Sequence, residues 1–353
     1  MDVSVLIPVY NTAAYLNQCL TSIAQSSLSI EIICLNDGST DGSLETLQHA
    51  AKRDARIAII DKDNEGYGAT LNKGLAIARG RYIAIIEPDD YLQGDMLSTL
   101  FELAEKNDFP DVVKSAYWQV GDNGRQKSHC SYWGRIKTVG KPIQIEEAPL
   151  LLRYHPSIWS AIYRREFLIE SGITFVEASG AGWVDNPFLI ETMFKAKSIV
   201  YTDDSFYCYR DDRIGSSTAS IGDYRIPFAR WNEMTDILES CKVQDTAIWG
   251  IHTYRAFYYF SSAQQASNFN EGDWIQEVQA AISRLRPEVI ARSPFVSPKN
   301  RALYEQLTGK SLENASNVPY YRMLIQEAFW KVRQNGVGYL ISRVRRKKAT
   351  HSA

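Results

Sequence analysis

Short apolar runs alternate with helix-spaced apolar positions along the first 90 residues of the chain. A nearly continuous apolar run is typical of a strand covered on both faces, and apolar residues spaced by three and four are typical of an amphipathic helix. The runs predict strands at Val3–Val9, Ile30–Leu35, Arg56–Ile60 and Tyr82–Ile86. The segments between them predict helices at Ala13–Gln25, Ser43–Arg53 and Gly68–Arg79. Repeated units of this kind indicate an α/β fold with a mostly parallel sheet and right-handed crossovers.

The regular alternation ends near residue 95. Beyond it, the pattern predicts a helix at Met96–Lys106, a strand at Val112–Val120 and an irregular insertion at Asp122–Pro142. Gly, Ser and Thr cluster in Ser216–Asp223, where we expect a linker. The sequence after this linker is helical and rich in aromatic residues. We therefore predict an α/β domain at 1–220 and a helical region at 221–353.

The composition of the chain argues against several classes of protein. A chain of 353 residues with 39 Lys and Arg against 41 Asp and Glu has a formal net charge of −2, which argues against a nucleic-acid partner. Its five dispersed cysteines fit neither a disulfide framework nor a zinc site and favour a reducing compartment. The first residues lack a basic stretch, and no apolar run reaches the roughly 18 residues of a membrane-spanning helix. A cytoplasmic protein is expected.

Carboxylates follow several of the predicted strands. Ligands of parallel sheets gather at the carboxyl ends of the strands, so these loops are expected to lie together. Glu87, Asp89 and Asp90 occupy three of four positions after an apolar strand, and a cation relieves the repulsion between such groups. Their oxygens suit Mg²⁺ or Mn²⁺, and we interpret the loop as a metal site. The alternative is a solvated turn that caps the following helix.

Two further loops at this edge carry candidate ligands. Asp37 lies in an N-D-G-S-T-D-G turn, where its carboxylate can accept hydrogen bonds from a base N–H or a ribose hydroxyl. The alternative, an Asx turn and N-cap, is preferred for Asp41. The segment Gly66-Tyr67-Gly68 lacks the third glycine of a dinucleotide fingerprint, which argues against a dehydrogenase. Its glycines permit either close approach of the backbone to a ligand or a simple turn.

Two aromatic-containing segments are candidates for acceptor binding. Asp185 follows Gly182-Trp183-Val184 at the predicted start of a helix, where it is either a helix cap or a general base beside an aromatic platform. Sugars stack on platforms such as Trp183. The segment that contains His155 and Trp159 also combines a titratable side chain with an aromatic ring, although a single histidine in such a segment is more often structural. We assign all three to the acceptor pocket.

Basic residues mark two more segments. Tyr207–Arg210, with Arg213 after it, is predicted to form a flexible basic segment after a short strand. It is either a loop that folds over a diphosphate or a solvated linker. Lys331–Lys348 holds seven basic residues, no acidic one and interleaved apolar residues. This tail is either a basic amphipathic stretch that contacts an anionic membrane surface, which we favour, or a solubilising terminal helix.

Four motifs in order resemble family 2 glycosyltransferases. They are V-S-V-L-I-P-V-Y-N at Val3–Asn11, N-D-G-S-T-D-G-S at Asn36–Ser43, Asn72-Lys73-Gly74, and A-R-G-R-Y-I-A-I-I-E-P-D-D at Ala78–Asp90. The resemblance covers about the first 100 residues and, more loosely, Val184–Ser217. It implies a GT-A fold, with a nucleotide-sugar-binding half at 1–118 and an acceptor half at 119–220. It also implies a nucleoside-diphosphate sugar as donor and an inverting reaction assisted by a divalent metal.

The resemblance also assigns roles to residues. It implies that Pro8 and Tyr10 line the nucleoside pocket, that Asp37 binds the base, that Asp89 is the metal ligand and that Asp185 is the catalytic base. Further donor-binding candidates, taken from the matched motifs and the strand-end loops, are Asn11, Asn64, Gly66, Lys73, Glu87, Arg210 and Arg213. The chain departs from the family at Glu87, Val184 and Leu71, where the first aspartate of the D-x-D motif, the glutamate of the E-D pair and an arginine are usual.

These observations predict a metal-assisted, inverting glycosyltransferase that uses a UDP-linked sugar. Its acceptor is expected to be a saccharide or lipid-linked saccharide in surface polysaccharide or glycolipid synthesis. We expect it in the cytoplasm, peripheral on the inner face of the plasma membrane. The alternative is a non-catalytic nucleotide-binding module that binds a partner glycosyltransferase through its C-terminal helices. A nucleotidyltransferase is disfavoured, because 8–13 lacks a glycine-rich basic loop.

Overall fold

The computed structural model describes residues 1–121, 127–210 and 221–336. They form two compact units. The first comprises the described residues of Met1–Ile221 together with Ala229–Val243, and the second comprises those of Gly222–Phe228 and Gln244–Ala353. The division at residue 220 and the two halves of the first domain stay predictions.

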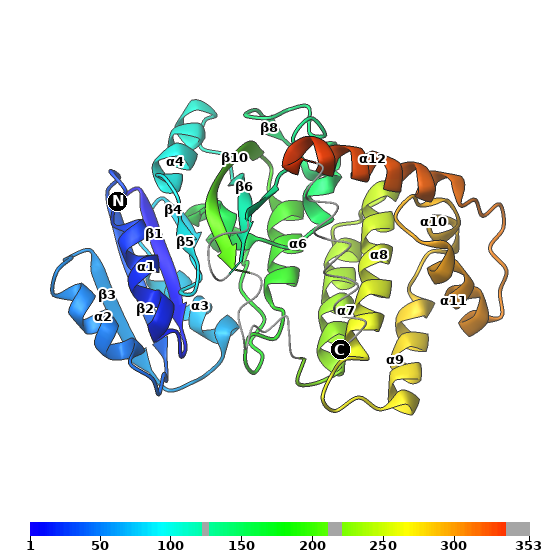
Figure 1. The fold of residues 1–353 in the computed structure, drawn as a ribbon, viewed down its shortest axis with the longest axis horizontal. Helices are drawn as coiled ribbons and strands as arrows, with labels where there is room; N and C mark the ends of the chain where they lie inside the picture. The colour runs from blue at the N-terminus through cyan, green and yellow to red at the C-terminus, as the bar shows by residue number, and fades with distance from the viewer. Residues whose placement is uncertain (122–126, 211–220, 337–353) are drawn as a thin grey trace. The chain divides into compact units, whose positions relative to one another are not determined.

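Among the described residues, a 10-stranded mixed sheet organises the first unit (Figure 1). Its strand order is β3-β2-β1-β4-β9-β6-β10-β5, with β7 paired to β6 and β8 paired to β10. The part formed by β3, β2, β1 and β4 is parallel, and β9 runs antiparallel to both β4 and β6. The strands are β1 (Val3–Val9), β2 (Ile30–Asp37), β3 (Ile57–Lys62), β4 (Tyr82–Ile85), β5 (Tyr91–Leu92), β6 (Val112–Val120), β7 (Lys127–Cys130), β8 (Pro142–Ile143), β9 (Ala161–Arg164) and β10 (Ile199–Arg210).

The centre of the parallel part is fully enclosed. Every residue of β1 and β2 is buried, and Val5 of β1 lies opposite Ile32 on one side and Ala84 on the other. Apolar side chains on both faces are what a parallel strand needs when helices cover the sheet from both sides. The predicted strands and the α/β fold class are therefore confirmed, and β2 ends at Asp37 rather than at Leu35.

The helices predicted from Ala13, Ser43 and Met96 begin at those residues, and the one predicted from Gly68 begins at Tyr67. In α4, Asp95 accepts a hydrogen bond from the Ser98 backbone N–H at 3.0 Å and caps the helix, whose buried residues recur every three or four positions. Helix α3 packs closely on the sheet, because a Cβ on Gly74 would lie 3.0–3.1 Å from Leu35 and Leu6. The helices are α1 (Ala13–Ile23), α2 (Ser43–Ala51), α3 (Tyr67–Ile77), α4 (Met96–Lys106), α5 (Arg165–Glu170) and α6 (Asp185–Lys195), with 3₁₀ turns η1 (Ile145–Glu147), η2 (Pro149–Leu152) and η3 (Ile158–Ser160).

Two segments differ from the sequence prediction. Within 122–142, predicted to be irregular, β7 pairs antiparallel with β6, and the His129 ring lies 4.7 Å from the ring of Trp118. The segment Tyr207–Arg210, predicted to be flexible, is the end of β10 and pairs with both β6 and β5. In both cases pairing with distant strands and aromatic packing override a weak local pattern.

Lys114 of β6 is buried among polar groups rather than beside a carboxylate. It is 2% exposed, and its Nζ donates to the backbone carbonyl of Ser157 at 2.6 Å and to the hydroxyls of Ser157 and Ser160 at 2.9 and 3.0 Å. Burial lowers the pKa of Lys114 to about 7. The side chain therefore fixes the η3 turn to the sheet at the cost of burying an amine.

The stability of the fold is expected to rise with pH through this lysine. Between the folded pKa of about 7 and the ordinary value of 10.5, the unfolded chain binds a proton that the folded chain lacks. The free energy of unfolding then increases with pH by at most about 1.4 kcal/mol per pH unit. Chemical denaturation from pH 7 to 10 should show this slope reduced in Lys114→Met and retained in Lys106→Met, which alters an exposed lysine. Equal slopes in all three proteins would contradict the prediction.

The second unit is helical. Asp245 caps α8 and Asn270 caps α9 through side-chain hydrogen bonds to backbone N–H groups. Phe228 and Phe260 stack at 5.5 Å between ring centroids, as the aromatic-rich pattern suggests. The helices after residue 221 are α7 (Arg225–Ser240), which contributes to both units, α8 (Thr246–Ala263), α9 (Glu271–Ser283), α10 (Pro287–Arg292), α11 (Pro298–Thr308) and α12 (Val318–Asn335). In the described part of the chain, no helix combines the length and apolar character needed to cross a bilayer.

Candidate active site

The carboxyl ends of β2, β1 and β4 meet at one edge of the sheet. Because β2 and β4 both run parallel to β1 and pair with it on opposite sides, the loops that follow them lie at the same edge. Asp37 ends β2, Tyr10 and Asn11 follow β1, and the loop at 87–90 follows β4. The structure therefore gathers the strand-end candidates as the sequence predicts.

The loop after β4 holds its carboxylates in different environments. Asp90 is 1% exposed, and it accepts hydrogen bonds from the Tyr207 hydroxyl at 2.9 Å and from the Arg210 backbone N–H at 2.8 Å. Burial and the charge of Asp89 raise the pKa of Asp90 well above its usual range. Asp90 therefore joins this loop to β10, whereas Asp89 is half-buried at the edge of the sheet.

Glu87 is close enough to both the candidate metal ligand and the candidate base to be affected by their charges. Burial and the negative charges of Asp89 and Asp185 raise the pKa of Glu87 to about 8, although a hydrogen bond from Tyr67 acts in the opposite direction. The Tyr67 hydroxyl donates to Glu87 Oε1 at 2.5 Å. The start of α6, which carries Asp185, is thus brought to the end of β4 across about 100 residues of sequence. Sequence reasoning missed Tyr67, whose one signal was its place between two glycines.

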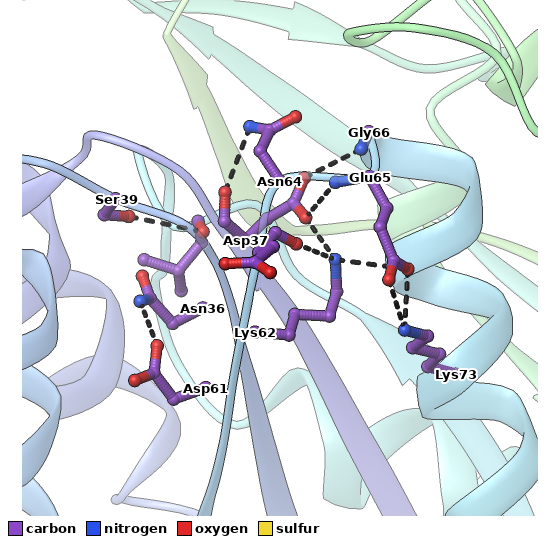
Figure 2. Close-up of polar contacts among 11 residues, drawn as sticks. Asn36, Asp37, Ser39, Asp61, Lys62, Asn64, Glu65, Gly66 and Lys73 are labelled. Carbon is purple, nitrogen blue, oxygen red and sulfur yellow. Dashed lines mark hydrogen bonds and ion pairs between the residues drawn. The ribbon is translucent and has the colours of Figure 1, made fainter.

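Asp37 organises the neighbouring loop. It is 4% exposed, pairs with Lys62, and accepts hydrogen bonds from the backbone N–H groups of Glu65 at 2.9 Å and Gly66 at 3.1 Å (Figure 2). Burial alone would raise the pKa of Asp37, but the hydrogen bonds from Lys62 and Glu65 outweigh it, and the pKa is lowered. Asp37 is therefore a charged residue that holds the 62–66 loop. Lys62 was not singled out from the sequence.

The other donor-binding candidates of this loop lie around Asp37. Asn64 is exposed, and its Nδ2 donates to the backbone carbonyl of Asp37 at 3.0 Å (Figure 2). Lys73 of α3 is exposed and pairs with Glu65 at 2.6 Å, and Glu65 also lies 3.7 Å from Lys62. A line of alternating charges thus runs from Asp37 to Lys73.

The loop after β1 is tied to the loop after β2. Pro8 is buried within β1, and Tyr10 is 51% exposed. Asn11 adopts a left-handed conformation with φ of 51°, which asparagine tolerates better than most residues. Its backbone N–H donates to Ser39 Oγ at 3.1 Å, and its Oδ1 accepts from the Thr40 N–H at 2.8 Å. Asn11 therefore fixes the backbone next to the exposed Tyr10.

Gly66 and Gly68 admit the protein's own backbone. A Cβ on Gly66 would lie 2.5 Å from the carbonyl oxygen of Ala178, and one on Gly68 would lie 2.1 Å from that of Val176. The expected close approach of backbone to a ligand is thus, in this structure, an approach of segment 176–180. Asn72 of the Asn-Lys-Gly motif holds the same segment, exchanging two hydrogen bonds of 2.8 and 2.9 Å with the backbone of Phe175.

Asp185 is the first residue of α6, one position after the buried Val184. It is half-buried, and its Oδ1 accepts a hydrogen bond from Asn186 Nδ2 at 3.0 Å. A carboxylate in the first turn is stabilised by the helix dipole. Trp183 is half-buried and has a left-handed backbone with φ of 56°. The helix-start position and the nearby carboxyl group of Glu87 are both compatible with a general base.

The two remaining acceptor candidates pack in an aromatic stack. Trp159 is 3% exposed, with its ring 4.0 Å from that of Tyr207 and 5.2 Å from that of Tyr209. His155 is half-buried, 4.9 Å from the Tyr209 ring, and its Nδ1 accepts from the Ser157 N–H at 3.0 Å. In this structure Trp159 packs against the two tyrosines at the end of β10, and the less buried His155 lies at the border of the aromatic stack.

Arg210 is fixed at the end of β10. It is 8% exposed, and its guanidinium donates to the Asp89 backbone carbonyl and to Gln18 Oε1 at 2.6 Å. It also lies 5.1 Å from the Tyr15 ring and 4.9 Å from the Tyr91 ring. Arg210 therefore holds the 87–90 loop in place rather than belonging to a flexible segment. Arg213 lies outside the described residues.

The donor set at this edge fits a divalent cation that a substrate helps to bind. Within the described ranges, no three His, Cys, Asp or Glu residues form a group able to hold a metal by themselves. Mg²⁺ and ions like it are commonly held by one or two carboxylates together with substrate phosphates. The half-buried Asp89 supplies one such carboxylate, whereas the raised pKa of Glu87 favours its neutral form at pH 7. The fit to Mg²⁺ or Mn²⁺ therefore depends on a bound diphosphate.

Comparisons with known proteins agree with this geometry. The family model for glycosyl transferase family 2 matches residues 4–171. The uncharacterized glycosyltransferase EpsJ of Bacillus subtilis is 33% identical over 213 residues, which make up 60% of this chain and 61% of EpsJ. The chain thus spans less than two thirds of this relative's length.

Solved structures share the fold. S. aureus TarS 1–349, crystallised with UDP-GlcNAc, superimposes with a TM-score of 0.70 at 19% identity and 92% coverage of both chains. The mannosyltransferase PcManGT of Pyrobaculum calidifontis, solved with GDP-Man and Mn²⁺, gives a TM-score of 0.50 at 14% identity, covering 89% of this chain and 88% of its own. The first unit has the GT-A-like fold, and the chain also has a helical C-terminal region. Residues 4–171 of this chain, a little under half of its length, match glycosyl transferase family 2.

Proposed function

We propose that this chain is an inverting glycosyltransferase that moves a sugar from a nucleoside-diphosphate sugar to a hydroxyl acceptor. The observation that carries the proposal is the gathering of Glu87, Asp89 and Asp185 at the carboxyl edge of a family 2 sheet. The acceptor that we propose is a saccharide or lipid-linked saccharide in surface polysaccharide or glycolipid synthesis.

The donor is proposed to lie over the loops after β1, β2 and β4. Tyr10 offers an exposed ring to the nucleoside, and the charged Asp37 lies where a carboxylate can orient the base. We propose a uridine nucleotide, in keeping with the UDP-GlcNAc complex of TarS. Lys73 and Arg213, the latter outside the described residues, are proposed to supply positive charge for the diphosphate.

Asp89 is proposed to hold Mn²⁺ or Mg²⁺. The Mn²⁺ in PcManGT supports a divalent ion in this fold. When bound, such an ion neutralises charge on the departing diphosphate. Arg210 contributes by fixing the backbone of Asp89, because its guanidinium donates to that residue's carbonyl oxygen.

Asp185 is proposed to act as the general base. It accepts the proton of the acceptor hydroxyl as the oxygen forms a bond to the anomeric carbon. The bond from that carbon to the phosphate oxygen breaks on the opposite face, and the nucleoside diphosphate leaves with the electron pair. Attack opposite the leaving group inverts the anomeric centre. Tyr67, by holding Glu87 at 2.5 Å, keeps a second carboxyl group in place beside the base.

We propose that the protein acts at the inner face of the plasma membrane as a peripheral membrane protein. The basic stretch Lys331–Lys348 supports this proposal by its charge. Most of that stretch, from Val337 onward, lies outside the described residues.

Thermal unfolding with nucleotides tests the donor site. We expect one of UDP, GDP, dTDP and CDP, and UDP in particular, to raise the melting temperature in the presence of Mn²⁺. A ligand at 100 times its Kd stabilises a protein by about 2.7 kcal/mol, which corresponds to a shift of several degrees. Addition of EDTA should reverse the shift, and Mn²⁺ alone is the control. No shift with any of the four nucleotides would count against a donor site.

A further inference from the structure

Helix α12 has an apolar face that is open to solvent. Large hydrophobic side chains exposed by more than 40% are concentrated on this helix. The most exposed is Ile325 at 72%, and Met323 is the one α12 residue that is buried. The exposed apolar residues are Val318, Tyr321, Leu324, Ile325 and Phe329.

These residues form one stripe along the helix. Positions 318, 321, 325 and 329 follow a spacing of three and four, so their side chains project from the same side of α12. Leu324, three residues after Tyr321, widens the stripe on one side. Tyr and Phe in such a stripe are suited to the boundary between water and lipid chains.

Positive charge borders the stripe. At 3.6 residues per turn, Arg322 and Arg333 project beside Phe329 along one border, and Lys331 projects beside Leu324 along the other. Glu327, the one acidic residue of α12, projects from the opposite side of the helix. Further along the sequence, residues 343–348 add five more basic side chains and no acidic one.

We infer that this face of α12 binds an anionic lipid surface, with the helix lying in the plane of the membrane. An apolar face bordered by Lys and Arg is the pattern of helices that lie in this plane. Lipid headgroups of negative charge are complementary to both borders at once. A second copy of the chain is not, because two such faces in contact would bring positive borders together.

The inference extends the proposed membrane contact from the tail to a folded, amphipathic surface. It differs in kind from binding by the tail alone, because the apolar stripe must enter the lipid. Lipid association would hold the chain where a lipid-linked acceptor is found. It does not require that the proposed reaction occur, since its test measures binding and not turnover.

Flotation of the full-length protein with vesicles tests the inference. We expect the protein to bind phosphatidylcholine vesicles that contain 30% phosphatidylglycerol on the order of tenfold or more tightly than it binds pure phosphatidylcholine vesicles. The physical reason is the attraction of Lys and Arg to anionic lipid. The double variant Ile325→Ser/Phe329→Ser should bind the anionic vesicles at least about tenfold more weakly. The matched control Ile169→Ser/Tyr258→Ser removes two side chains that are 58% and 50% exposed on other helices, and it should bind like the parent.

Charge variants distinguish the contribution of α12 to vesicle binding from that of the tail. Arg322→Gln/Arg333→Gln should weaken binding by about fivefold per charge at low salt, whereas Lys106→Gln/Lys310→Gln should not. Circular dichroism confirms that each variant folds. Unchanged binding by the Ile325/Phe329 variant would overturn the inference in favour of the tail alone. Light scattering tests the other occupant. If the parent protein were a dimer and the Ile325/Phe329 variant a monomer, the inference would be overturned in favour of a second copy of the chain.

Discussion

Replacing Asp185 with asparagine is expected to lower kcat by about a thousandfold while leaving donor binding intact. General-base catalysis contributes roughly 10² to 10⁴ in rate, and an amide cannot accept the proton of the acceptor hydroxyl. Asparagine keeps the size of the side chain and the oxygen that accepts from Asn186 at 3.0 Å, so the start of α6 should be preserved. The loss should therefore appear in kcat and not in the affinity for the donor.

Single-turnover assays and nucleotide titration measure the two quantities separately. Glu166→Gln is the matched control, because it neutralises an exposed carboxylate in the first turn of another helix, α5. It should retain the parent's kcat. Full activity in Asp185→Asn would exclude this residue as the base. A parent protein that binds donor but turns over none of the acceptors offered would favour the alternative of a non-catalytic, partner-binding module.

Asp89→Asn is expected to lower kcat/KM by at least about a hundredfold and to remove the effect of EDTA on nucleotide binding. The neutral amide is a poor ligand for a hard divalent cation, and charge neutralisation by such an ion accounts for several kcal/mol of the barrier to diphosphate departure. The backbone should be unaffected, because Arg210 bonds to the carbonyl oxygen of Asp89 and not to its carboxylate. Isothermal titration with UDP, with and without Mn²⁺, measures the effect.

The matched control for this change is Asp108→Asn. Asp108 is exposed and has a left-handed backbone with φ of 56°, a conformation that asparagine also tolerates. Its variant should bind UDP with the same Mn²⁺ dependence as the parent. If Asp89→Asn kept that dependence too, the ion would have to be held elsewhere.

The parallel core was predictable from sequence because its pattern is local and redundant. Continuous apolar runs at Val3–Val9 and 30–35 can be satisfied only by strands covered on both faces, and the structure buries every residue of β1 and β2. The topology then brings Asp37 and the 87–90 loop to one edge, which is why these candidates could be named without coordinates. The shorter pairing of β7 and the end of β10 depended on partners far away in sequence and was missed.

The sequence by itself therefore determined the fold class, the sheet edge at which the candidate site lies and the carboxylates that lie there. The tertiary structure decided what each of these groups touches. Asp90 faces β10 while Asp89 lies at the edge, and Gly66 and Gly68 receive segment 176–180. Spacing along a chain sets which side of a strand or helix a residue occupies, but burial, hydrogen bonds and charge depend on elements that meet only after folding. For the same reason, the sequence predicted only a helical region after residue 221 and a basic amphipathic tail, and the exposed face of α12 became visible only once the helices were packed.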